Sequence, residues 1–122
     1  MLKCAGLFFA CGILCRAANS GAVQYGKQLV EEVAKCGDCH TPRKATGGLD
    51  ASKWLKGASL PKASPDLTAS GHLFREWGEQ GMVKFLETGV GPTGHPADPP
   101  MPTYKLKKAD AEAMVEFLES LK

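Results

Sequence analysis

Two cysteines and a histidine stand within one pentapeptide, Cys36-Gly37-Asp38-Cys39-His40. Thiols at this spacing lie on one side of a helical turn, where each can add to one vinyl group of a porphyrin and form a thioether bond. The histidine that follows at once can then bind the iron through Nε2. The motif therefore predicts one covalently bound haem c, with the iron rather than a side chain carrying electrons.

Two other kinds of site use paired cysteines. A redox disulfide of the thioredoxin type needs strands that alternate with helices, and the pattern of this chain does not alternate in that way. A structural zinc ion usually takes four ligands, and the nearest further candidates are His72 and His95, because no second cysteine pair follows. A thiol or metal protein without haem stays open as an alternative.

An iron held by His40 has a sixth position that a side chain either fills or leaves open. Candidate ligands are Met82, Met101, Met114, His72 and His95. Met82 and Met114 fall on apolar helical faces, where methionine usually fills the core. Met101 lies in Pro99-Pro100-Met101-Pro102, whose stiff backbone holds a thioether at a small entropic cost. Met101 is therefore the predicted ligand and His95 the second choice. An open position would instead indicate a small haem peroxidase or a gas-binding protein.

The first 20 residues predict export. A basic start, Met1-Leu2-Lys3, precedes an apolar run from Cys4 to Cys15, and Ala18-Asn19-Ser20 fits the small-x-small pattern before a cleavage site. The run is too short to span a bilayer comfortably, which takes about 20 residues. We expect a signal peptide at 1–20, a domain at 21–122 and a periplasmic protein. An uncleaved anchor, lipidation and association with a membrane stay open.

Removing the signal peptide changes the composition. Three of the five cysteines go with it, so the remaining two are both in the motif and none is left for a structural disulfide. Two of the 15 basic residues also go, which leaves 13 against 13 acidic residues. A charge near zero gives no reason to expect nucleic-acid binding. About a hundred residues make one small domain with a thin core, which a buried porphyrin would complete.

Helices and long loops, without strands, are expected to position the motif. Apolar spacing predicts a helix from Val23 to Lys35 that runs straight into it, a second over Phe74 to Thr88, and a closing helix from about Lys108 to Leu121. A short helical turn is expected at Ala51–Leu55, and glycines and prolines mark the loops between these elements. The expected fold class is all-α, with three main helices and long loops around one haem.

Together these motifs resemble a class I cytochrome c over residues 22–122. Pro100-Met101-Pro102-Thr103-Tyr104 is similar to the family's Met-Pro-x-Tyr ligand loop, and Ser64-Pro65-Asp66-Leu67-Thr68 to a Pro-Asn-Ile-Thr segment near the propionates, with Asp66 in place of the Asn. The likeness is closest to bacterial single-haem domains that occur alone or as cytochrome subunits of membrane dehydrogenases and oxidases. It implies a fold in which the first and last helices cross, with Gly26 and Phe117 at the crossing.

The expected haem has further contacts with the chain. His40 Nδ1 is expected to donate to a nearby carbonyl, that of Pro42, which fixes the ring. Four side chains are candidate donors to the propionates: Arg43, Trp54, Thr68 and Trp77. The expected partners are redox proteins, such as a dehydrogenase, an oxidase or another cytochrome, which meet an exposed haem edge through a small interface.

Overall fold

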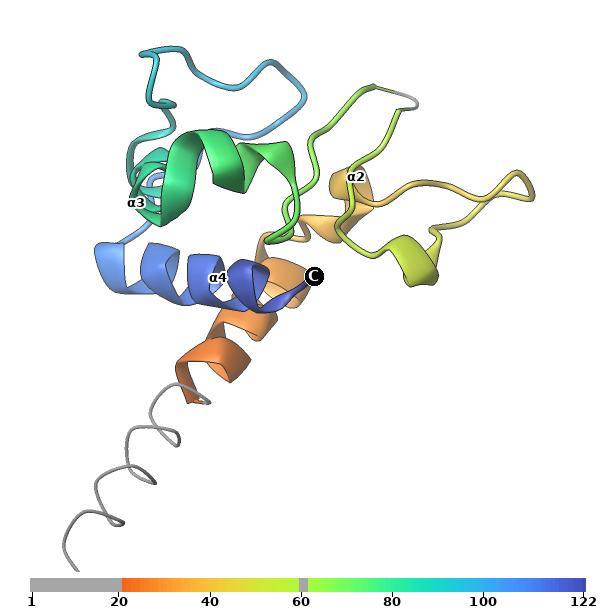
Figure 1. The fold of residues 1–122 in the computed structure, drawn as a ribbon, viewed down its shortest axis with the longest axis horizontal. Helices are drawn as coiled ribbons and strands as arrows, with labels where there is room; N and C mark the ends of the chain where they lie inside the picture. Colours follow the sequence, from red (N-terminus) through yellow and green to blue (C-terminus); the bar gives the residue numbers. More distant parts are fainter. Residues whose placement is uncertain (1–20, 60–61) are drawn as a thin grey trace, which may run out of the picture.

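The computed structural model describes residues 21–59 and 62–122, so the predicted signal peptide lies outside the described residues. Residues 21–28 are helical and continue into the π-helical turn η1 (Leu29–Val33). The elements that follow are α2 (Gly37–His40), the 3₁₀ turn η2 (Ala51–Lys53), α3 (His72–Thr88) and α4 (Lys108–Ser120). In these ranges β structure consists of isolated bridges, such as Arg43 with Leu49. The all-α class is confirmed, and Figure 1 shows long loops between the helices.

The first helix ends before the motif rather than running straight into it, as the spacing had predicted. The amide of Ala34 donates to Leu29 O at 2.8 Å and closes the π turn. Lys35 then has a φ of 54°, a left-handed conformation that a non-glycine residue adopts only when its surroundings hold it there. The Cys36 amide donates to Val30 O at 3.0 Å. The chain therefore changes direction at Lys35, and α2 begins as a separate turn.

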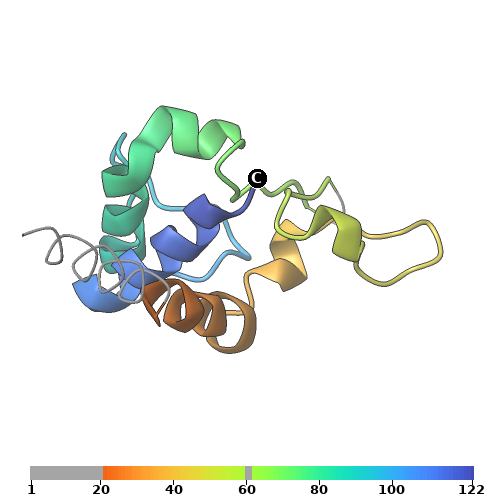
Figure 2. The same ribbon diagram turned by 60° about the horizontal axis from the view of Figure 1, so that its bottom comes forward.

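The first and last helices cross at a glycine. A Cβ at Gly26 would overlap the carbonyl oxygen of Ala113 in α4, and would lie 3.1 Å from the Cβ of Phe117. Figure 2 shows α4 passing over the helix of residues 21–33. Beside the crossing, the Tyr25 hydroxyl donates to Asp110 Oδ1 at 2.8 Å. The predicted crossing is thus confirmed, with backbone packed directly against backbone.

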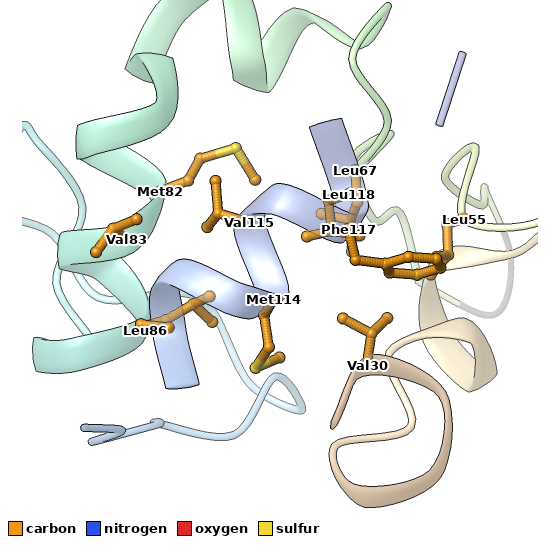
Figure 3. Close-up of a cluster of buried hydrophobic side chains, with 11 residues drawn as sticks. Val30, Leu55, Leu67, Met82, Val83, Leu86, Met114, Val115, Phe117 and Leu118 are labelled. Atoms are coloured by element: carbon orange, nitrogen blue, oxygen red, sulfur yellow. The ribbon is translucent and has the colours of Figure 1, made fainter. Parts of the chain in front are cut away.

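The core lies between α3, α4 and the first helix, and Figure 3 shows its side chains. Met82 and Met114 are 5% and 1% exposed, which confirms both as core residues. Leu55 and Leu67 reach the core from the loops on either side of residues 57–66, and the Leu67 amide donates to Leu55 O at 2.9 Å. This pairing brings the loop after the motif back to the motif. None of the helices in the described part of the chain is long and apolar enough to cross a membrane.

Candidate functional site

The pentapeptide forms one helical turn that carries both thiols. The His40 amide donates to Cys36 O at 2.9 Å, and the Cys39 amide to the same oxygen at 3.2 Å. Both cysteines are free, with Cys39 exposed and Cys36 half-buried. Burial raises the pKa of the Cys36 thiol to about 11, so at neutral pH it keeps its proton. A thiol is the form whose S–H adds across a vinyl double bond.

The glycine between the cysteines has a packing role. A Cβ at Gly37 would overlap the ring of Trp54, so the indole lies directly against the motif backbone. The Trp54 Nε1–H donates to Glu31 Oε1 at 3.1 Å, which ties the ring to the first helix. Spacing alone gave no sign of this contact, because it joins residues far apart in the sequence. In the structure the Trp54 donor is therefore bonded to a carboxylate, and its role at a propionate stays a prediction.

His40 is held in one orientation and one tautomer. The ring is 5% exposed, and Nδ1 lies 2.9 Å from Pro65 O. Because a carbonyl can only accept, Nδ1 carries the proton, and the lone pair is on Nε2. Burial lowers the pKa of His40, and the hydrogen bond to Pro65 opposes that shift. A neutral imidazole with a free Nε2 is the form that binds iron.

The partner of Nδ1 differs from the one predicted. Pro42 was expected because it follows the motif closely, but its carbonyl accepts from the Asp50 amide at 2.8 Å instead. Pro65, 25 residues from His40, takes the role. The reason is the pairing of Leu55 with Leu67, which returns the chain to the motif just after Pro65.

Three further contacts from this returning segment hold the motif. The Gly57 amide donates to His40 O at 2.7 Å, and the Ser64 hydroxyl donates to Cys39 O at 2.6 Å. The Leu55 amide donates to the hydroxyl oxygen of Thr41, a side chain only 1% exposed. Sequence reasoning missed these residues. The available signals were a threonine directly after the motif and a serine in the segment that resembles Pro-Asn-Ile-Thr.

Ser64→Ala is expected to lower the stability of the domain. It removes the bond to Cys39 O and the bond that Ser64 Oγ accepts from the Ala58 amide. A loss of about 1–2 kcal/mol follows, or a fall of roughly 4–8 °C in melting temperature for each kcal/mol. Thermal unfolding followed by circular dichroism measures it. Ser59→Ala, at an exposed position in the same loop, is the control, and an equal fall in both variants would contradict the assignment.

Thr68 and Asp66 form a local turn rather than pointing polar groups outward. Thr68 is 1% exposed, its amide donates to Asp66 Oδ1 at 2.7 Å and its hydroxyl donates to the same atom at 2.6 Å. The Lys56 ammonium donates to the Thr68 hydroxyl at 3.2 Å. Asp66 thus keeps a polar contact at the position where the family pattern has Asn. The assignment of Thr68 to a propionate stays a prediction, since its hydroxyl donates to Asp66 here.

The other two candidate propionate donors lie in different surroundings. Arg43 is exposed in the loop after the motif. Trp77 is half-buried in α3, with its ring centroid 5.3 Å from that of Phe85. Their assignment to a propionate stays a prediction as well.

The segment that carries Met101 is tied to the attachment turn. Met101 is half-buried, and its amide donates to Asp98 O at 3.2 Å. Three residues later the Tyr104 hydroxyl donates to Ala34 O at 3.2 Å, just before the motif. Burial raises the pKa of Tyr104, and the nearby thiol groups of the motif add to the shift. His40 and Met101 lie near each other, whereas His95, the second choice, is exposed.

Two more contacts fix the position of this segment. The Lys62 ammonium donates to Pro99 O, which joins the loop after the motif to the loop before Met101. Beyond Tyr104, the Leu106 amide donates to Leu86 O at 3.0 Å. Tyr104 belonged to the motif that carried the family resemblance, yet its contact with Ala34 could not be predicted from the sequence.

The donor set fits a covalently held haem. Two free thiols lie on one turn next to a buried imidazole, and Nε2 of His40 has no hydrogen-bond partner among the described residues. A thioether follows in a separate loop nearby. Within residues 21–59 and 62–122, no three His, Cys, Asp or Glu side chains gather as they would around a metal ion. His40 and the two thiols are thus arranged for iron held in a porphyrin.

Comparison with known proteins gives a family match and three relatives. The sequence pattern of the family described as cytochrome c matches residues 23–122. A diheme cytochrome c-type protein of Cereibacter sphaeroides is 30% identical over 77% of this chain and 33% of its own length. The fructose dehydrogenase cytochrome subunit of Gluconobacter japonicus is 32% identical, over 79% of this chain and 21% of its own length. A nicotinate dehydrogenase subunit of Pseudomonas putida is 31% identical, over 79% and 9%. The chain thus spans a third or less of each of these relatives.

Proposed function

Because the chain belongs to the cytochrome c family, we propose that it is an exported electron carrier with one haem c, bound to Cys36 and Cys39 and held between His40 and Met101. The observation that carries the proposal is the state of His40. Its ring is buried, Nδ1 is engaged by Pro65, and Nε2 is left to bind iron beside the two free thiols. The nearness of Met101 supports a thioether as the sixth ligand.

The haem supplies reversible one-electron chemistry when bound. The residues of the chain set its conditions. Cys36 and Cys39 keep the group attached, and the hydrogen bond to Pro65 keeps His40 Nε2 directed at the metal. The soft sulfur of Met101 favours the reduced iron, so the potential lies above that of a bis-histidine site. A histidine and a methionine can stay bound in both oxidation states, so little has to move when an electron arrives.

The proposed place of the domain is between a dehydrogenase and a further acceptor in the periplasm. Two of the relatives are named as parts of dehydrogenases, and the third is a diheme cytochrome. The basic and apolar start of the chain supports export, and the near balance of charges after residue 20 fits a protein partner rather than nucleic acid. The partner itself would receive or deliver electrons through a brief encounter with the haem edge.

The sixth ligand is tested by the visible spectrum of the ferric holoprotein, made in cells that attach haem. The wild type is expected to show the weak thioether-to-iron charge-transfer band at the red end of the spectrum. Met101→Leu is expected to lose the band and to lower the reduction potential, while covalent haem remains. Met114→Leu is the matched control, because Met114 is buried in the core, and it is expected to keep the band.

Three results would contradict the ligand pair. A wild type without the band that binds cyanide or carbon monoxide readily would favour a haem enzyme or a gas-binding protein. A wild type without the band whose spectrum changes in His95→Ala would assign the sixth position to His95. Loss of the band in Met114→Leu but not in Met101→Leu would show that the wrong methionine was chosen.

A further inference from the structure

Helix α3 contains a break that only glycine can make. Gly78 lies inside His72–Thr88 with φ 67° and ψ 176°. This region is essentially closed to residues with a Cβ, because the side chain meets the neighbouring peptide groups. Figure 2 shows the two parts of α3 running in clearly different directions. A Cβ at Gly78 would meet nothing within 4 Å, so glycine is needed here for its backbone conformation and not for space.

The break brings two aromatic side chains together. Trp77 and Phe85 are eight residues apart, which in an unbroken α-helix puts them about 12 Å apart along the axis. Their ring centroids are 5.3 Å apart, with the planes at 52°. The turn at Gly78 therefore leans Trp77 back along the second half of the helix. A Cβ at Gly81 would lie 3.0 Å from the Trp77 Cβ, so there is little room for the indole elsewhere on this face.

On its other side the indole meets the loop that leads to Met101. A Cβ at Gly91 would lie 3.0 Å from Cζ2 of Trp77, so the ring is close to the loop backbone. The loop is closed on itself at this point, since the Gly91 amide donates to His95 O at 2.9 Å and Val90 bridges to Pro96. A shift of Trp77 is thus passed to the whole turn of residues 90–96, which stands directly before the segment that holds Met101.

From these contacts we propose that Gly78 is a positioning residue for the Met101 loop: its left-handed break holds Trp77 against Gly91 and so sets how firmly the loop keeps the sulfur on the iron. The proposal rests on the proposed function, because it takes Met101 as the sixth ligand. It assigns to a glycine outside the haem contacts an effect on ligand binding. A purely structural glycine would affect unfolding but not the competition for the sixth position in the folded protein.

The test is a titration of the ferric holoprotein with imidazole, which competes with Met101 for the iron. Gly78→Ala is expected to bind imidazole about tenfold more tightly than the wild type, about 1.4 kcal/mol, as the loop gives up the sulfur more easily. Gly47→Ala is the matched control. Gly47 has a φ of 89° and open space around its Cβ, but it lies in the turn after the motif. It is expected to stay within about twofold of the wild type on the same affinity scale.

A second variant approaches the same contact from the loop. In Gly91→Ala the new methyl group presses on the indole at 3.0 Å without a strained backbone, and imidazole binding is again expected to tighten. This variant decides the matter if Gly78→Ala yields no holoprotein. Unchanged affinity in the folded variants, or an equal change in Gly47→Ala, would overturn the role of Gly78. A wild type without the thioether band would overturn the ligand assignment itself, which is a different failure.

Discussion

The Gly26→Val variant is expected to yield no folded holoprotein. A Cβ at Gly26 would already overlap the carbonyl oxygen of Ala113, and the added methyl groups of valine would push further into α4 near Phe117. The first helix carries the chain into Cys36, so separating the two helices also displaces the attachment turn. Overpacking usually costs about 1–3 kcal/mol, and a clash with backbone costs more because the backbone cannot rotate away. That loss is large beside a total stability of about 5–15 kcal/mol.

The measurement is the yield of soluble haem-stained protein and its thermal unfolding. Gln24→Val is the control, because Gln24 is exposed on the same helix and receives the same β-branched side chain. It is expected to reduce stability by less than about 1 kcal/mol. Valine is a better helix former than glycine, so a loss at Gly26 cannot come from helix propensity. Wild-type yield and stability in Gly26→Val would contradict the crossing.

The double variant Cys36→Ala, Cys39→Ala is expected to carry no haem that survives denaturation. Both cysteines are free and lie on the turn that ends at His40. Without their sulfurs no thioether can form, and His40 alone would hold haem only reversibly. Because the domain is small and its core thin, we also expect a large loss of folded protein. Haem staining after denaturing electrophoresis measures the first effect and circular dichroism the second.

Asp38→Ala provides the matched control. Asp38 stands between the two cysteines and is exposed, so its replacement alters the motif without removing a sulfur. Full haem content is expected in this variant. Retention of denaturation-resistant haem in the double alanine variant would show that the group is attached elsewhere, and a redox-active double variant without haem would favour a thiol or metal protein.

The motif, the main helices and the core methionines could be predicted because their signals are local. Apolar residues at helical spacing place Met114 on the inner face of α4, and the structure buries it. The crossing at Gly26 followed from the family resemblance, since no local pattern tells a close approach from any other glycine. The thioether ligand and the propionate contacts stay predictions, because they involve a group outside the chain.

What could not be predicted depends on long-range packing or on single backbone angles. The Nδ1 partner of His40 is Pro65 and not Pro42, because the chain returns to the motif through the pairing of Leu55 with Leu67. The left-handed turn at Lys35 interrupts a run of apolar residues that reads as one helix. The break at Gly78 has the same character, since a glycine inside a helical pattern does not tell whether its φ is negative or positive.

The most direct test of the account is the intact mass of the protein under denaturing conditions, after purification from the periplasm of cells with the haem-attachment machinery. The account predicts a polypeptide that begins at Gly21 and carries the added mass of one haem, with fragments that place it on the peptide containing Cys36 and Cys39. A bare polypeptide from such cells would contradict it.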